Sequence, residues 1–128
     1  MGAAYNSPDS LKESYQAEAN RGCVARLQYQ ITNWAGFWMK LQGADLRPYS
    51  RLVFDVRADP QPGIPGQMKL ELKRANEVSI KYVSGLSADW QTISVRLSEF
   101  GYAGYGKPVY SWQGIDELVV VFEETGLP

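Results

Sequence analysis

The chain alternates apolar and polar residues with a period of two, in one short segment after another. In residues 52–57 and 68–73, every second residue is apolar and most of the residues between are charged. Because successive side chains of a strand point to opposite faces, each segment is predicted to be a strand with one buried and one wet face. Several such strands without a helical pattern between them predict a sandwich or a barrel.

Turn signals separate these segments and predict a single all-β domain, residues 1–128, folded as an antiparallel β-sandwich. The short spacer at 75–77 predicts a hairpin, and the Pro- and Gly-rich residues 59–66 predict a surface loop. Residues 1–20 are expected to be an irregular lead-in with a short strand around residues 12–16. The predicted strands cover residues 23–31, 35–42, 51–57, 67–74, 78–83, 90–97 and 115–123.

The last predicted strand is the most apolar. Its run at 118–122 predicts burial on both faces, or an outward face that another element covers. Val119 and Val121 are expected on the outward side.

Charge and composition exclude several kinds of partner. The 128 residues carry a net charge of -1 and no basic block, so nucleic acid is not an expected partner. No run approaches ~20 consecutive apolar residues, so neither a membrane-spanning helix nor a membrane partner is expected. The first residues lack the basic and apolar regions of a signal peptide.

Cys23 is the only cysteine, which excludes an internal disulfide, and it is expected to be a small buried residue.

The wet faces carry the first candidate binding site. If neighbouring strands share a sheet, their outward residues form a polar surface with one aromatic platform, Trp38. A sugar needs such a platform for the C–H face of its ring, and polar groups around it for its hydroxyls. The alternative is a solvated face stabilised by cross-strand charge pairs of about 0.2–1 kcal/mol each. Beside Lys69, the candidate ligand-binding residues of this face are Gln28, Trp38, Lys40, Asp55, Arg57, Glu71 and Lys73.

A Gly- and Tyr-rich loop at 100–114 is the second candidate site. Its glycines let the backbone approach a ligand, and its tyrosines offer apolar rings with hydroxyl tips. The alternative is that Phe100 and Trp112 plug the ends of the sandwich while the tyrosines cover them. Trp90 is predicted to lie in the core, and Trp34 at the edge of either site. The candidate binding residues of the loop are Tyr102, Tyr105 and Tyr110.

Catalysis is not expected. A glycosidase needs two carboxyl groups about 5–10 Å apart, one of them with a raised pKa. Asp55 and Glu71 are the candidate pair, but nearby Lys and Arg residues are expected to keep both ionised. No cofactor is expected, and a chain without histidine and with one cysteine has no ordinary zinc site. A structural calcium ion held by loop oxygens stays open, with conceivable ligands at Asn6, Asp9, Asp116 and Glu117.

Several segments resemble a known family. Residues 52–57 are similar to its Leu-x-Phe-x-Val-Arg strand, and residues 112–118 match the segment before its late core strand. The most specific piece is Asp89-Trp90-Gln91 followed by residues 93–100, which resembles the Asp-Trp-Gln … Ile-x-x-x-Leu-x-x-Phe signature of galactose-binding-like jelly-roll domains. Over residues 23–123 the chain is most similar to family-eleven-type carbohydrate-binding modules and the related mitochondrial complex I assembly domain.

The resemblance implies a jelly roll that binds a β-glucan-like carbohydrate on a concave sheet face and rim loops, without catalysis. It also implies a secreted or extracellular setting. The family has a leading strand, and a closing strand of the type Gly-x-Ile-Tyr-Ile-Asp-Asp-Ile, that are not recognisable here. A missing strand would leave an open sheet edge for self-association or for a partner strand. A protein-interaction or assembly domain is therefore the alternative function.

Overall fold

The computed structural model describes residues 11–29, 34–61 and 63–123, apart from the side chain of Leu11. These residues form strands and a single three-residue 3-10 turn, so the all-β prediction is confirmed. The elements are β1 (Leu11–Glu18), β2 (Gly22–Tyr29), β3 (Trp34–Ala44), β4 (Arg51–Val56), β5 (Gln67–Arg74), β6 (Glu77–Ser84), β7 (Gln91–Arg96), η1 (Leu97–Glu99), β8 (Gly101–Tyr102) and β9 (Ile115–Glu123).

Each segment predicted to be a strand overlaps one, and β5 and β9 have the predicted bounds. The predicted hairpin joins β5 to β6, with Arg74 opposite Glu77 and Ala75 at φ 52° in the turn. β1 is longer than the short strand expected within the lead-in, and residues 1–10 of that lead-in lie outside the described residues. The two-residue strand β8 has no counterpart among the predicted strands.

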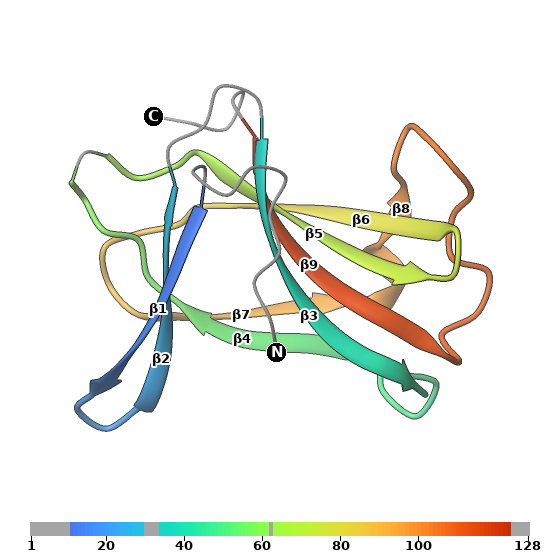
Figure 1. Cartoon of the computed structure of the whole chain (residues 1–128), viewed down its shortest axis with the longest axis horizontal. Helices are drawn as coiled ribbons and strands as arrows, with labels where there is room; N and C mark the ends of the chain where they lie inside the picture. The colour runs from blue at the N-terminus through green and yellow to red at the C-terminus, as the bar shows by residue number, and fades with distance from the viewer. Residues whose placement is uncertain (1–10, 30–33, 62, 124–128) are drawn as a thin grey trace.

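The strands form two layers. The first is a five-stranded antiparallel sheet in the order β3-β9-β5-β6-β8. Opposite it lie the antiparallel pair β4-β7 and, at one end of the molecule, the β1-β2 hairpin (Figure 1). Phe37 and Leu70 of the first layer and Val95 of the second belong to one hydrophobic core, so the predicted sandwich is confirmed.

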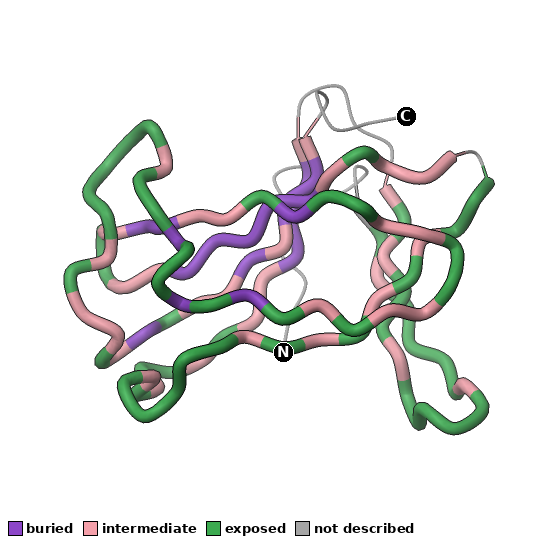
Figure 2. The backbone as a smooth tube through the Cα atoms, turned by 180° about the vertical axis from the view of Figure 1, so that it is seen from behind, coloured by how far each residue is buried: buried purple, intermediate pink, exposed green. Residues whose placement is uncertain are grey.

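Alternation decides which residues of each strand enter this core. On β5, Leu70 is buried among core residues, while the next residue, Glu71, points to the other face of the same sheet. We call the two faces of each layer inner, toward the core, and outer. Figure 2 shows that the buried segments concentrate in the five-stranded sheet.

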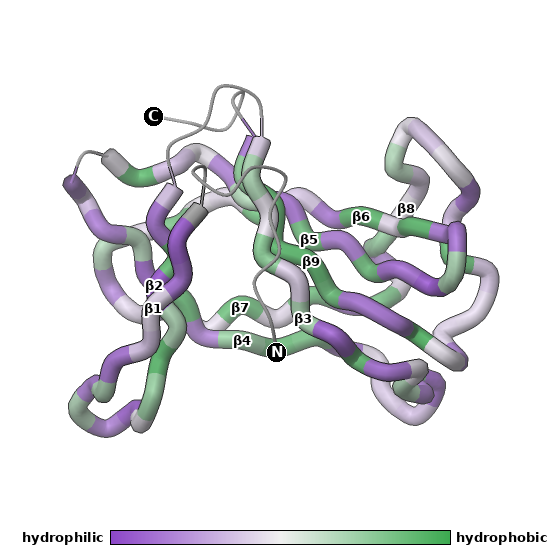
Figure 3. Tube along the Cα trace, in the orientation of Figure 1, coloured by the Kyte–Doolittle hydropathy of each residue, from purple (hydrophilic) through white to green (hydrophobic). Residues whose placement is uncertain are grey.

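β9 is an interior strand of the sheet, between β3 and β5, and hydrophobic residues run along it (Figure 3). Val119 and Val121 are on the outer face as predicted, yet they are 0% and 5% exposed, so the strand is buried on both faces. The last strand therefore offers no open edge, because it is paired on both sides.

The β1-β2 hairpin projects beyond the core, and most of its residues are exposed (Figure 2). Cys23 pairs with Ala17 near the hairpin turn and is exposed, so its predicted burial is wrong. The turn end of β2, where Cys23 lies, extends beyond the core, so no other element covers this residue. No helix within the described ranges is long and apolar enough to cross a membrane.

Candidate functional site

The outer face of the five-stranded sheet is the candidate site. The strand register places Lys40, Glu117 and Lys73 in one row across β3, β9 and β5. The next row holds Trp38, Val119 and Glu71, and the third holds Gly36, Val121 and Lys69. Three strands that are far apart in the sequence thus bring one tryptophan and the charged residues of β3, β5 and β9 together on one face.

Two indoles lie around a glycine on β3. A Cβ at Gly36 would stand 2.8 Å from Cζ3 and 2.9 Å from Cη2 of Trp38, and 3.4 Å from Cζ3 of Trp34. The two indole centroids are 6.1 Å apart and tilted by 56°. Because position 36 has no side chain, the Trp38 ring lies back along its own strand instead of standing away from the sheet. Both tryptophans remain half-buried.

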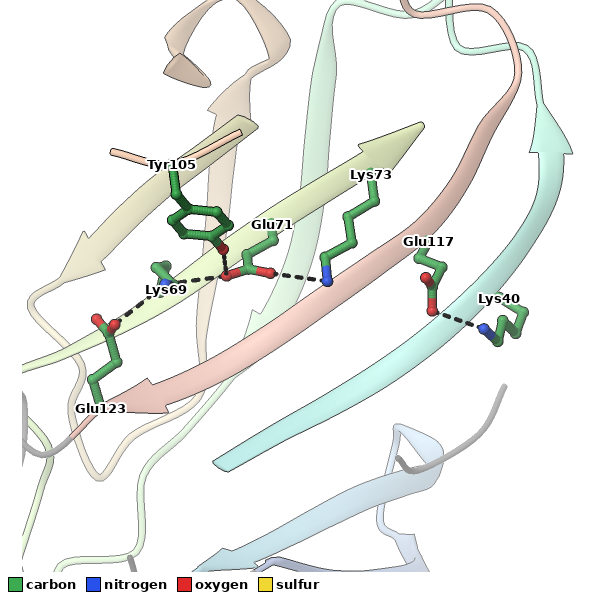
Figure 4. A network of polar contacts seen from close by, with 7 residues as sticks. All are labelled: Lys40, Lys69, Glu71, Lys73, Tyr105, Glu117 and Glu123. Carbon is green, nitrogen blue, oxygen red and sulfur yellow. Dashed lines mark hydrogen bonds and ion pairs between the residues drawn. The ribbon is translucent and has the colours of Figure 1, made fainter. Parts of the chain in front are cut away.

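The same face carries a buried ion pair between Lys69 and Glu71 (Figure 4). The Lys69 ammonium lies 3.1 Å from Oε2 of Glu71 and 3.2 Å from Oε2 of Glu123, and Lys73 lies 3.6 Å from Oε1 of Glu71. Lys69 and Glu71 are only 7% and 5% exposed. The Tyr105 hydroxyl donates to Glu71 at 3.3 Å. Every buried side-chain polar atom in the part of the chain that the structure describes has a hydrogen-bond partner, so the network is satisfied.

The network shifts the titration of its members. Burial is the largest single effect on Lys69 and lowers its pKa, but the hydrogen bonds and charges of Glu71 and Glu123 outweigh burial and leave the pKa above its ordinary value. For Tyr105, burial first and then the charge of Glu71 raise the pKa of the phenol. The lysine therefore stays charged, and the tyrosine stays a neutral donor, over the whole physiological range.

Two further contacts complete the face. Lys40 forms an ion pair with Glu117 at 2.8 Å (Figure 4), and the Lys73 ammonium lies 5.9 Å from the centroid of the Trp38 ring. Three lysines and three glutamates make the face electrically neutral: Lys40, Lys69, Lys73, Glu71, Glu117 and Glu123.

The predicted site residues divide between different surfaces. Trp38, Lys40, Glu71, Lys73 and Tyr105 meet on the outer face of the five-stranded sheet. The others lie elsewhere: Gln28 on β2, Asp55 and Arg57 on or directly after β4, and Tyr102 and Tyr110 as exposed residues of the loop.

The predicted single polar surface is therefore split. It required β2 and β4 to share a sheet with β5, whereas β4 pairs with β7 in the opposite layer. For the same reason Asp55 and Glu71 do not face each other. The loop combines both interpretations, because Phe100 and Trp112 pack at the core with their ring centroids 6.3 Å apart, while Tyr105 reaches the network.

Trp90 was predicted to lie in the core, and this is wrong. It is half-buried, with the Arg21 guanidinium 4.3 Å and the Arg57 guanidinium 5.5 Å from its ring centroid. Counting back along the β4-β7 register puts Trp90 opposite Arg57, on the outer side of that layer. A pocket of about 330 Å³ opens beside the indole, between β2 and β4.

Asp55 lines the same pocket and is held by two donors. The Thr92 hydroxyl donates at 2.6 Å, and Arg21 at 2.8 Å. The hydrogen bond from Thr92 first, and that from Arg21 second, keep the pKa of Asp55 below its ordinary value. The carboxylate is thus ionised and already partnered at neutral pH.

The site also contains residues that the sequence analysis did not select. Trp34 was placed only at an edge, and Gly36, Tyr82 and Glu123 were not chosen. The Tyr82 hydroxyl donates to Glu123 at 2.8 Å, which ties β6 to the end of β9. The spacing Trp34-x-Gly36-x-Trp38 is the signal that could have found the first two, because a period of two puts all three on one face of a strand.

The two candidate calcium ligands that lie among the described residues, Asp116 and Glu117, each contact another residue of the protein. Asp116 accepts a hydrogen bond from the Ala75 amide at 2.8 Å, and Glu117 pairs with Lys40. Asn6 and Asp9 lie outside the described residues. Within the described ranges, no group of three or more His, Cys, Asp or Glu residues is placed to hold a metal ion.

Comparison with known proteins does not assign this chain to a family. A scan against models of protein families, a search of curated proteins and a search of solved structures each give no match to this chain.

Proposed function

We propose that this protein is a non-catalytic carbohydrate-binding module of the galactose-binding-like jelly-roll type. Its ligand is a neutral polysaccharide of the β-glucan kind, held on the outer face of the five-stranded sheet. The observation that carries the proposal is the pair of half-buried indoles, Trp34 and Trp38, around Gly36, directly beside fixed polar side chains. The C–H face of a pyranose ring packs on an indole, as other apolar rings do.

The neighbouring polar groups suit a sugar's hydroxyls. Lys40 is exposed, the half-buried Lys73 has its ammonium 5.9 Å from the Trp38 ring centroid, and both can donate to hydroxyls. The Tyr105 hydroxyl, whose proton is donated to Glu71, can accept a hydrogen bond. Their partners Glu117 and Glu71 already hold them in place, so little side-chain freedom is lost when a ligand binds. Because the face is neutral, an uncharged chain fits it better than a polyanion.

Affinity electrophoresis against a panel of soluble neutral polysaccharides tests this proposal. We expect the wild type to be retarded by at least one β-glucan, and Trp38→Ala to lose most of that retardation. Tyr49→Ala is the control, because Tyr49 is an aromatic residue that is exposed and lies away from the sheet, in the loop between β3 and β4. A folded wild type retarded by none of the glucans, or a Trp38→Ala variant retarded as strongly as the wild type, would count against the proposal.

A protein-interaction or assembly role is the second candidate, and the position of β3 favours it. β3 is eleven residues long and, among the described strands, pairs only with β9. The edge of a sheet at a strand of that length can accept a strand from another chain. Sizing of the purified protein over a range of concentrations tests this: a concentration-dependent dimer supports the edge, and a strict monomer at high concentration opposes self-association.

A further inference from the structure

A second surface, on the opposite layer, carries an unusual pair of charges. Arg51 of β4 and Arg96 of β7 are directly opposite each other, and both are exposed. Neither has a carboxylate partner among the described residues, and the only side-chain hydrogen bond found for the pair runs from Arg51 to the Ser94 hydroxyl at 3.1 Å. Like charges directly opposite in a sheet reduce stability. Within the described residues the pair therefore gains nothing from ion pairing, and apart from the hydrogen bond of Arg51 to Ser94 its N–H donors have no side-chain partner there.

The same outer face continues along both strands to Trp90. After the arginine pair come Val53 opposite Ser94 and then Asp55 opposite Thr92. Val53 is 56% exposed, so an apolar side chain lies open in the middle of the face. From Arg51 to Arg57 the face extends about 20 Å, given about 3.3 Å per residue of a strand. We call this surface the β4-β7 strip.

The two ends of the strip differ in charge. At the Trp90 end, the guanidinium groups of Arg21 and Arg57 are matched by Asp55 at 2.8 Å and by Glu18 at 3.5 Å. At the other end, no carboxylate among the described residues pairs with the guanidinium groups of Arg51 and Arg96. One end thus offers an indole between two cations beside a pocket, and the other offers two neighbouring guanidinium groups.

We propose that the β4-β7 strip binds an acidic polysaccharide. A carboxylate or sulfate group of the chain lies between Arg51 and Arg96, and a sugar ring several units away packs at Trp90. Guanidinium pairs bind carboxylate and sulfate by charge-assisted, often bidentate hydrogen bonds. The exposed Val53 and the hydroxyl of Ser94 line the path between the two ends.

The distribution of charge favours a glycan over nucleic acid. A phosphate backbone needs a dense basic track. In this strip, by contrast, the cations without a carboxylate partner among the described residues lie at one end only, and the chain has a net charge of -1. This site lies on the other layer from the neutral face proposed above and takes a different class of ligand. Its failure and the failure of the glucan site are therefore separable.

Affinity electrophoresis in polygalacturonate at low ionic strength tests the strip, with fully methyl-esterified polygalacturonate as the uncharged counterpart. We expect the wild type to be retarded only by the acidic form. The double variant Arg51→Gln/Arg96→Gln should bind at least about tenfold more weakly. Dextran sulfate against dextran tests sulfate in the same way, and arginine-dependent retardation by either acidic polymer supports the proposal.

The matched control is Arg26→Gln/Arg47→Gln, which removes the same charge from arginines that have their own partners, Asp59 and Asp45. It should bind the acidic polymers like the wild type. Thermal unfolding should show Arg51→Gln/Arg96→Gln to be as stable as the wild type, so a loss of binding does not reflect a loss of fold. Absence of retardation by both acidic polymers, equal loss in the control, or equally arginine-dependent binding of an oligothymidylate would overturn the proposal.

Discussion

The benzo ring of Trp38 lies against Gly36 so closely that a methyl group at position 36 would stand 2.8 Å from its Cζ3. Real Cβ atoms do not approach carbon at that distance, so the position of the indole depends on the absence of a side chain two residues earlier. The glycine is on a regular stretch of β3 and pairs with Val121. Gly36 therefore serves to let the Trp38 ring approach the backbone, and it does not form a turn.

Gly36→Ala should displace the Trp38 indole from the sheet. We expect a shift in tryptophan fluorescence, a loss of stability of about 1–3 kcal/mol from overpacking, and weaker binding to any glucan that the wild type binds. Gly101→Ala is the control, because a Cβ at Gly101 meets no atom within 4 Å. If the alanine at position 36 left both fluorescence and binding unchanged, the glycine would have no part in placing the ring.

Glu71→Gln should destabilise the protein by about 2–4 kcal/mol, because Lys69 would keep its buried charge with only Glu123 to balance it. The apolar double variant Lys69→Met/Glu71→Leu should recover at least half of that loss. Urea unfolding measures both. Lys40→Ala, which breaks a pair whose lysine is 65% exposed, should cost less than about 1 kcal/mol. Equal losses for Glu71→Gln and Lys40→Ala would show that burial does not distinguish the two pairs.

Local alternation predicted the strands and their faces well, and the reason is visible on β5. Lys69, Glu71 and Lys73 alternate with apolar residues, and all three lie on the outer face. The same rule correctly placed Trp38 on an outer face. It needs only neighbouring residues, since the direction of each side chain is set by the strand itself.

Partnership between strands could not be predicted in the same way. β9 pairs with β3, and this contact joins Trp38 to Val119, about eighty residues later in the chain. Nothing in the local pattern of a strand states which other strand lies beside it. Asp55 was therefore grouped with Glu71, although the structure places them in opposite layers.

Trp90 was misplaced for a different reason. Its resemblance to a packing motif indicated the core, whereas its register with Arg57 puts it on the outer side.

Acid should remove the stabilisation that Asp55 provides. Its pKa is lower in the folded protein than in the unfolded chain, so its contribution is complete above the unfolded pKa of about 4 and is lost as the pH falls through the folded pKa. Unfolding midpoints measured from about pH 6 to pH 2 should therefore fall less steeply for Asp55→Asn than for the wild type. Parallel curves for the two proteins would mean that Thr92 and Arg21 do not bind the carboxylate in solution.

Alkali should act on the network of the five-stranded sheet. The pKa of Lys69 is higher in the folded protein, so its contribution is complete below about pH 10 and is lost as the pH rises through the folded pKa. Burial likewise raises the pKa values of Tyr82 and Tyr105. Stability should therefore decline above about pH 10, and less in Lys69→Met/Glu71→Leu. The same decline in both proteins would place its cause outside the ion pair.

Within the second layer, Trp90 connects the β1-β2 hairpin to the β4-β7 pair. Among the described residues the hairpin and β4 share no sheet, so side chains make this connection. Arg21 of the hairpin contacts the Trp90 ring and binds Asp55 of β4. A cation over a partly desolvated indole is worth about 0.5–2 kcal/mol. Removal of the ring should therefore loosen the hairpin before it affects the core.

Trp90→Ala should increase amide hydrogen exchange in β1 and β2 by up to about tenfold, while exchange in β5 and β9 changes less. The reason is that the core strands keep all their backbone pairing, whereas the hairpin loses a contact that ties it to β4. Exchange measured by mass spectrometry with peptide resolution separates the two regions. Arg47→Ala is the control, because Arg47 pairs locally with Asp45 at 2.9 Å. An equal rise in exchange over all strands would mean that Trp90 supports the whole sandwich, and an unchanged hairpin would mean that the remaining ion pairs hold it alone.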